Sequence, residues 1–159
     1  MKITIDPFDQ KSIDKALKDL AAYKKWVAEK EKLLRDRLSM IGATVARIEF
    51  SRAIYSGDND VTVRVDDSGS VAVIYAEGES VAFIEFGAGA RYGDGHPMNG
   101  EFGTGPGTYP DGKGHWDDPG GWYYAHGKHT FGNPPAMAMV HARDAMLEQL
   151  TAIAREVFK

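Results

Sequence analysis

The 159-residue chain contains no cysteine. This absence excludes disulfide bonds, a thiolate nucleophile and any zinc site built on cysteine. No apolar run approaches the roughly 18 residues that a membrane-spanning helix needs. The first residues, Met1–Ile5, alternate as in a strand and already include a lysine. Charge returns at Asp6, too early for the apolar segment of a signal peptide, so we expect synthesis in the cytosol and no contact with a membrane.

An excess of positive charge is also absent, because 23 Asp and Glu residues outnumber 19 Lys and Arg residues and the formal net charge is −4. This balance does not supply the broad basic face of a typical nucleic-acid-binding domain. Apolar residues make up 43% of the chain and charged residues 26%, which is ordinary for one soluble domain with a core, and we predict a single domain over 1–159. A local basic cluster near the N-terminus consists of Lys15, Lys18, Lys24, Lys25 and Lys30.

A long helix is predicted from Ser12, which is a good N-cap residue. Apolar residues recur every seven positions, while the second seam between them is half polar. This pattern indicates a long amphipathic helix with a narrow buried face. Gly42 predicts a break or kink, and the turn residues at 56–60 place the helix end between Gly42 and Ser56. The apolar row is Ile13, Leu20, Val27, Leu34, Ile41 and Ile48.

Three short strands joined by tight turns are predicted next, at 61–65, 71–75 and 81–86, as an antiparallel meander. A C-terminal helix follows, with Asn133 as its cap and Pro134–Pro135 in its first turn. These elements predict an α+β fold in which a small antiparallel sheet packs against the long N-terminal helix and the C-terminal helix. The apolar stripe of the last helix is Met139, Met146, Leu150, Ile153 and Val157.

Residues 87–133 form a long segment rich in glycine, proline, histidine and aromatic residues. A loop of this length in a compact domain is usually functional, and its aromatics distinguish it from a plain disordered linker. The glycines at 103, 105 and 107 resemble a phosphate-binding loop only superficially, because prolines interrupt them and no helix follows. We therefore predict an insertion within the single domain that becomes ordered on assembly.

Side chains that could carry chemistry support two alternatives of lower rank. One is a metal-dependent hydrolase that uses His115, Asp117, His126 and His129, although their spacing matches no helical metal motif. The other is a small bacterial binding module. Glu85 lies among apolar neighbours with no partner close in sequence, so we expect an ion pair, a hydrogen bond into the glycine-rich segment, or a solvent-facing edge. We predict no catalytic residue, no bound metal and no cofactor.

The segment Phe83-Ile84-Glu85-Phe86-Gly87-Ala88-Gly89 resembles the (F/V)-E-(F/Y)-G-(T/S)-G strand end of a family of phage neck proteins. These are the head–tail connector or tail-completion proteins of tailed phages and prophages. Ala88 stands where the family usually has Thr or Ser, and Met-Ala-Met at 137–139 stands where a Phe is common. The family's other motifs occur in the same order: Ala16-Leu17 with Leu20, Arg37-Leu38 with Gly42, Tyr55-Ser-Gly57-Asp-Asn59-Asp60-Val61, Gly121-Trp122-Tyr123-Tyr124, and Gly132 with Pro135, Ala136 and Met139.

The resemblance implies a structural virion protein without enzymatic activity. Such proteins form rings at the neck, between the head connector and the tail tube. The implied partners are further copies of the chain and the neighbouring head-connector and tail-tube or tail-terminator proteins. DNA would pass through the ring without sequence-specific binding, and a net negative chain suits a wall that should not hold phosphates.

The implied location is the host cytoplasm during assembly and then the neck or tail of the virion. Buried aromatic residues dominate the energies of protein interfaces. The subunit contacts that we expect are Phe86, Trp116, Trp122, Tyr124 and Phe131.

Overall fold

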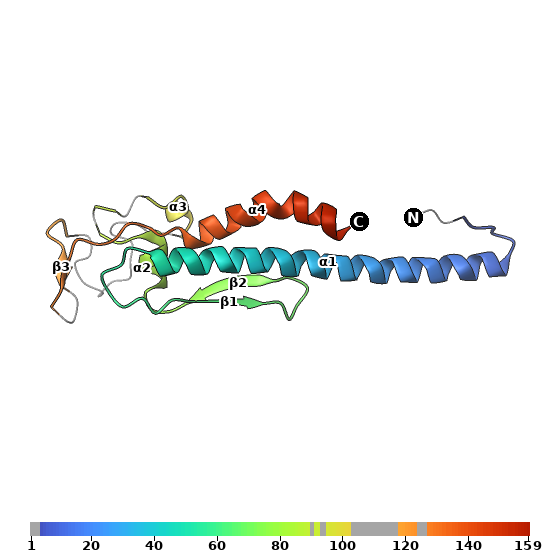
Figure 1. Cartoon of the computed structure of the whole chain (residues 1–159), viewed down its shortest axis with the longest axis horizontal. Coiled ribbons are helices and arrows are strands. Elements are labelled where there is room, and N and C mark those ends of the chain that lie inside the picture. The colour runs from blue at the N-terminus through green and yellow to red at the C-terminus, as the bar shows by residue number, and fades with distance from the viewer. Residues whose placement is uncertain (1–3, 90, 93–94, 103–117, 124–126) are drawn as a thin grey trace.

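The computed structural model describes residues 4–89, 91–92, 95–102, 118–123 and 127–159 (Figure 1). They form an α+β fold with two small antiparallel sheets, so the predicted fold class is confirmed. Within these residues, no helix is both long and apolar enough to cross a bilayer. The elements are α1 (Gln10–Arg52), β1 (Thr62–Asp66), β2 (Val73–Glu77), α2 (Val81–Phe86), α3 (Asn99–Phe102), β3 (Trp122–Tyr123), β4 (His129–Thr130) and α4 (Ala138–Val157).

The frame of the molecule is α1, whose 43 residues give a helix about 64 Å long. Figure 1 shows α4 along one side of α1 and the β1–β2 hairpin along another, both beside the C-terminal part of α1. The two helices run antiparallel, because His141 near the start of α4 lies 3.8 Å from Glu49 and Phe158 after its end stacks edge-on with Trp26. The N-terminal part of α1 extends beyond both neighbours (Figure 1).

The start of α1 differs from the prediction. The helix begins at Gln10 and its N-cap is Asp9, whose Oδ1 accepts the backbone N–H of Lys11 at 3.0 Å. Ser12 lies inside the first turn, where its Oγ accepts the backbone N–H of Asp6 at 2.9 Å. Both side chains can accept a backbone hydrogen, and the turn before the helix decides which of them becomes the cap.

The end of α1 lies within the predicted window. The helix ends at Arg52, and the side chain of Asn59 donates to the backbone carbonyl of Phe50 at 2.9 Å. The same side chain accepts the backbone N–H of Val61 at 3.2 Å, which leads the chain into β1. Asn59 thus satisfies a carbonyl that the helix end leaves unpaired.

Gly42 does not break or kink α1, contrary to the prediction, because the helix continues through it. A Cβ atom at this position would lie 2.6 Å from Cδ1 of Ile74 and 2.7 Å from Sδ of Met146. The glycine therefore provides room where side chains from β2 and α4 meet over α1. Its role is close packing, which offsets its poor helix propensity.

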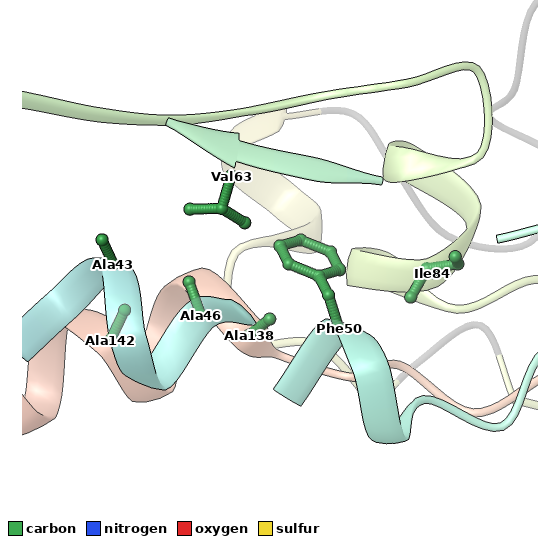
Figure 2. Packing of buried hydrophobic residues seen from close by; sticks show 7 residues of the cluster. All are labelled: Ala43, Ala46, Phe50, Val63, Ile84, Ala138 and Ala142. Carbon is green, nitrogen blue, oxygen red and sulfur yellow. The ribbon is translucent and has the colours of Figure 1, made fainter. Parts of the chain in front are cut away.

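The core is built around small side chains at the crossing of α1 and α4. Ala43 and Ala46 of α1 face Ala138 and Ala142 of α4, while Phe50 points toward the hairpin (Figure 2). The remaining core members in the figure are Val63 and Ile84. Small residues allow two helix backbones to approach closely.

The seven-residue apolar row is therefore not the buried face of α1. Leu20 is 54% exposed and Ile48 is 39% exposed. The stripe predicted for α4 also differs, since Leu150 is 38% exposed while Ile153 and Val157 are buried. Large apolar residues indicated the helical period correctly, but they do not mark the closest contact.

The first sheet has two strands, and the predicted third strand is wrong. β1 pairs with β2 in antiparallel register from Thr62↔Glu77 to Asp66↔Val73. Residues Val81–Phe86 form the helix α2. A short apolar run such as 81–86 is compatible with a strand and with a short helix that buries Ile84. Tertiary contacts decide between these two conformations.

The side chain of Asp60 fixes the turn that leads into α2. Its carboxylate accepts the backbone N–H groups of Glu79 at 2.6 Å and Ser80 at 3.0 Å, and it also accepts the Ser80 hydroxyl. These bonds, the Ser80 hydroxyl first, lower the pKa of Asp60 from 3.8 to about 2. They hold the N-terminus of α2 against the start of β1.

The start of α4 also corrects the prediction. The helix begins at Ala138, after Met137 in the left-handed region with φ 52°. Pro134 and Pro135 precede the helix instead of forming its first turn. Asn133 is not the cap, because it is buried and its side-chain amide donates to the backbone carbonyl of Phe83 at 2.8 Å.

Candidate functional site

The two ends of the 87–133 insertion lie side by side. Ala88 and Asn133 exchange two backbone hydrogen bonds of 3.0 Å each, as an isolated antiparallel bridge. Gly87, Gly89 and Gly132 flank this bridge with φ values of 78°, 90° and 102°. This backbone conformation favours glycine, and a Cβ at Gly132 would also collide with the carbonyl of Ala88. The insertion is thus closed at its base by backbone contacts.

Glu85 joins this base to the last helix. Its side chain is buried, and its two carboxylate oxygens lie 3.1 and 3.2 Å from the backbone nitrogen of Met139, which donates to them. The first turn of α4 has no cap from its own preceding side chain. A carboxylate from α2 therefore takes the place of the N-cap and faces the positive end of the α4 dipole.

His96 completes the junction from inside the insertion. Its Nδ1 accepts the backbone N–H of Met98 at 3.1 Å, so Nε2 carries the proton and donates to Oε1 of Glu85 at 3.2 Å. Of the alternatives predicted for Glu85, a hydrogen bond into the glycine-rich segment is confirmed. Phe86 packs edge-on against the His96 ring, with ring centroids 4.4 Å apart.

An apolar groove of about 360 Å³ lies beside the Glu85–His96 pair. Val81, Met98 and Val140 contribute much of its wall. The carboxylate facing it is already hydrogen-bonded to a helix N-terminus and to an imidazole. Its geometry is that of a structural junction, since an acid–base catalyst needs an accessible atom aimed at the reacting group.

The far part of the insertion is an aromatic hairpin, which we define as Trp122–Phe131 within the described residues. β3 pairs with β4 through Trp122↔Thr130 and Tyr123↔His129. The rings of Tyr123, His129 and Phe131 follow one another edge-on at centroid distances of 4.7 and 4.8 Å. Tyr123 is 71% exposed, so this ladder presents aromatic surface to solvent.

Charge and hydrogen bonds hold the ladder in place. The guanidinium of Arg91 lies 3.9 Å from the ring centroid of Phe131, within the range of a cation–π contact. Nε2 of His129 lies 3.0 Å from the backbone carbonyl of Gly120 and donates to it. The arrangement is suited to binding another surface through aromatic faces and edges.

The predicted contact residues are divided between the base and the hairpin. Phe86 is half-buried at the base, Trp122 is half-buried in β3, and Phe131 is 39% exposed. Trp116 and Tyr124 lie outside the described residues.

The predicted contact residues did not include Tyr123 and His129 of the ladder, or Arg91, which packs on its Phe131 ring. Neighbouring residues of a strand point to opposite faces. The half-burial of Trp122 therefore predicts an exposed Tyr123.

The metal-site alternative has one residue, His129, within the described part of the chain. His115, Asp117 and His126 lie outside the described residues. In the described part of the chain, no three His, Asp or Glu side chains gather in a geometry that could hold a metal ion.

Comparison of the chain with family models, with curated proteins and with solved structures finds no match.

Proposed function

We propose that the chain is a structural subunit of the neck of a tailed phage or phage-derived particle, a tail-completion or head–tail joining protein that forms a ring. The proposal rests on the collinear motifs that resemble the neck family. The structural observation that best supports the proposal is that apolar groups are exposed at both ends of the long helix α1. The aromatic hairpin lies at one end, and the N-terminal part of α1 lies at the other (Figure 1).

Two motifs of the resemblance have structural roles that support the frame of such a subunit. In the Phe83–Gly89 motif, Glu85 caps α4 and the glycines permit the bridge at the base of the insertion. In the Tyr55–Val61 motif, Asn59 ends α1 and Asp60 begins α2. Both motifs hold projecting segments on a fixed body, which is what a ring subunit needs.

The proposal assigns no catalytic role. The buried Glu85–His96 pair is the acid–base pair that an enzyme hypothesis would first consider. Its polar atoms are engaged with Met139 and Met98, and they connect α2, the insertion and α4. The pair is explained by the stability of the junction without a substrate.

In the proposed particle, the partners are neighbouring copies of the chain, the head-connector protein and the tail-tube or tail-terminator protein. DNA passes through the ring without sequence-specific contacts, as the net charge of −4 favours. The subunit is made in the host cytoplasm and then resides in the virion neck.

The test is the mass of the purified protein by light scattering over a concentration series, with negative-stain electron microscopy of the same samples. We expect a rise toward a closed oligomer and annular particles. A protein that stays monomeric at every concentration would contradict the proposed ring. Bound metal in that monomer would support the hydrolase alternative instead.

A further inference from the structure

The N-terminal part of α1 is a helical arm that neither α4 nor the β1–β2 hairpin covers (Figure 1). We define the arm as Gln10–Lys25, because α4 ends beside Trp26, where Phe158 stacks. The arm projects beyond α4 and the hairpin in Figure 1, over about 24 Å of helix. A projecting helix gains most of its stability from packing an apolar face, and this one has such a face exposed.

The arm combines an apolar seam with a row of lysines. Leu17 is 61% exposed and Leu20 is 54% exposed, and both lie on one helix face. Lys11, Lys18 and Lys25 follow one another at seven-residue spacing, roughly a quarter-turn from Leu17 and nearly opposite Leu20. Within the arm, residues 10–25, there are five lysines and two aspartates. The arm is therefore basic although the chain is acidic.

The β1–β2 hairpin carries the opposite charge. Residues 58–79 contain six carboxylates and one arginine. Asp66 and Asp67 lie at the turn end, and Glu77 and Glu79 lie at the other end, about 14 Å away along the strands. All four are exposed. The acidic residues of the hairpin are Asp58, Asp60, Asp66, Asp67, Glu77 and Glu79.

Two exposed valines lie at the turn end of the hairpin, where Val73 pairs with Asp66, while Arg64 in the middle of β1 forms an ion pair with Glu77. Val71 is 66% exposed and Val73 is 51% exposed. Lys18 and Lys25 are about 10 Å apart along the arm, and their flexible stems can cover the remaining distance to the two acidic ends. The arm and the hairpin thus match in charge and in length, and both carry exposed apolar side chains beside their charges.

The arm cannot reach the hairpin of its own chain. The turn of the hairpin lies beside Arg35, whose guanidinium donates to the carbonyl of Ser70. Lys18 lies 17 positions earlier on the same continuous helix, which is about 25 Å away. Because α1 is one unbroken helix, the arm cannot fold back, and the matching surface must belong to another molecule.

A precedent for this contact exists within one copy. Lys32, also on α1, bonds Asp36 at 2.9 Å and lies 3.9 Å from Asp67 of the hairpin turn. A lysine on a helix thus already approaches the acidic hairpin. The arm extends the same chemistry beyond the reach of its own hairpin.

We infer that the arm of one copy docks on the β1–β2 hairpin of a neighbouring copy, with Leu17 over Val71 and Val73, Lys18 on the carboxylates of the turn end and Lys25 on those of the other end. The inference rests on the proposed ring and names its subunit contact. The two surfaces differ, so the contact is head-to-tail, and repeated head-to-tail contacts close into rings when the rotation allows. Duplex DNA is a weaker occupant, since phosphates would pair with the lysines but leave the leucine seam uncovered.

The test reverses charge on each surface and then on both. The arm variant is Lys18→Glu with Lys25→Glu, and the hairpin variant is Asp67→Lys with Glu79→Lys. A matched control, Arg155→Glu with Lys159→Glu, makes the same change of net charge as the arm variant at exposed residues outside the arm, the β1–β2 hairpin and the aromatic hairpin. Circular dichroism of each variant verifies that the helix content is kept.

Light scattering and electron microscopy then measure assembly at low and high salt. We expect the arm and hairpin variants to weaken assembly about tenfold or more, the combined variant to recover it, and the control to resemble the unmodified protein. High salt should weaken the unmodified contact, because screening shortens the range of exposed charges. In addition, Leu17→Gln should reduce assembly by a similar factor at low and at high salt, because it removes an apolar contact and leaves the charges unchanged.

The possible outcomes separate the two proposals. Rings that form equally well with the arm reversed would overturn the arm contact and leave the proposed function standing. An unmodified protein that never assembles would overturn both. An electrophoretic shift of duplex DNA that disappears in the arm variant, without any change in self-assembly, would assign the lysines to DNA and overturn the arm contact.

Discussion

Replacing Glu85 by alanine tests the junction at the base of the insertion. The change removes the carboxylate that caps α4 at Met139, and loss of an N-cap costs about 1 kcal/mol. It also leaves the buried Nε2–H of His96 without its acceptor, at a cost of about 1–3 kcal/mol. We therefore expect Glu85→Ala to lower the free energy of unfolding by about 2–4 kcal/mol, measured by urea denaturation followed by far-UV circular dichroism.

The control for this prediction is another glutamate in an ion pair. Glu156 lies 3.0 Å from Arg37, but its side chain is 64% exposed, so Glu156→Ala should cost less than about 1 kcal/mol. A double-mutant cycle with His96→Ala should give a coupling of about 0.5–3 kcal/mol between Glu85 and His96. If Glu85→Ala costs no more than Glu156→Ala, the junction does not stabilise the fold as argued.

Three further predictions concern the backbone, the pH dependence and the hairpin. Gly132→Ala should destabilise the protein more than Gly127→Ala in thermal melts, since both sites have positive φ but only Gly132 faces a backbone carbonyl; equal losses would contradict the steric argument. Because the pKa of Asp60 is lowered to about 2, its stabilising effect is complete above about pH 4 and is lost as the pH falls toward 2. Asp60→Asn should therefore flatten the acid limb of unfolding free energy against pH, and an unchanged limb would refute this. Trp122→Ala should weaken assembly in light scattering more than it lowers the melting temperature, and the reverse would make Trp122 a core residue.

Local chemistry explains which elements could be predicted. The helical period of 10–52, the turn residues at 56–60 and the hairpin from Thr62 to Glu77 all follow from short-range patterns. The end of α1 was predicted because Asn59 and its neighbours are turn-forming residues whose bonds are local. The class α+β follows from these elements alone.

The predictions of local structure were wrong where contacts with distant residues select one of two conformations that the local sequence allows. Val81–Phe86 can alternate as a strand or turn as a helix, and the bonds from Asp60 select the helix. Asn133 can cap a helix, but the approach of Ala88 and Phe83 engages its backbone and side chain first. Neither partner can be identified from the neighbouring sequence.

In the candidate site, too, some features follow from the local sequence and others depend on folding. The aromatic, glycine-rich composition of 87–133 marked the insertion, and the buried setting of Glu85 was indicated by its apolar neighbours. That Glu85 meets His96 and the first turn of α4 depends on three segments brought together by folding. The ladder of Tyr123, His129 and Phe131 likewise depends on the register of β3 with β4.

Periodicity and turn chemistry act over a few residues, so the amino-acid pattern predicts a long α1, an antiparallel hairpin and a C-terminal helix. The face of α1 that is buried depends instead on contacts with distant segments. Small residues such as Ala46 and Ala142 form the closest helix contact, while the larger Leu17 and Leu20 remain on a projecting arm. The physical reason is that burial depends on where α4 begins and ends beside α1, and this follows from the junction at Glu85, which no local pattern encodes.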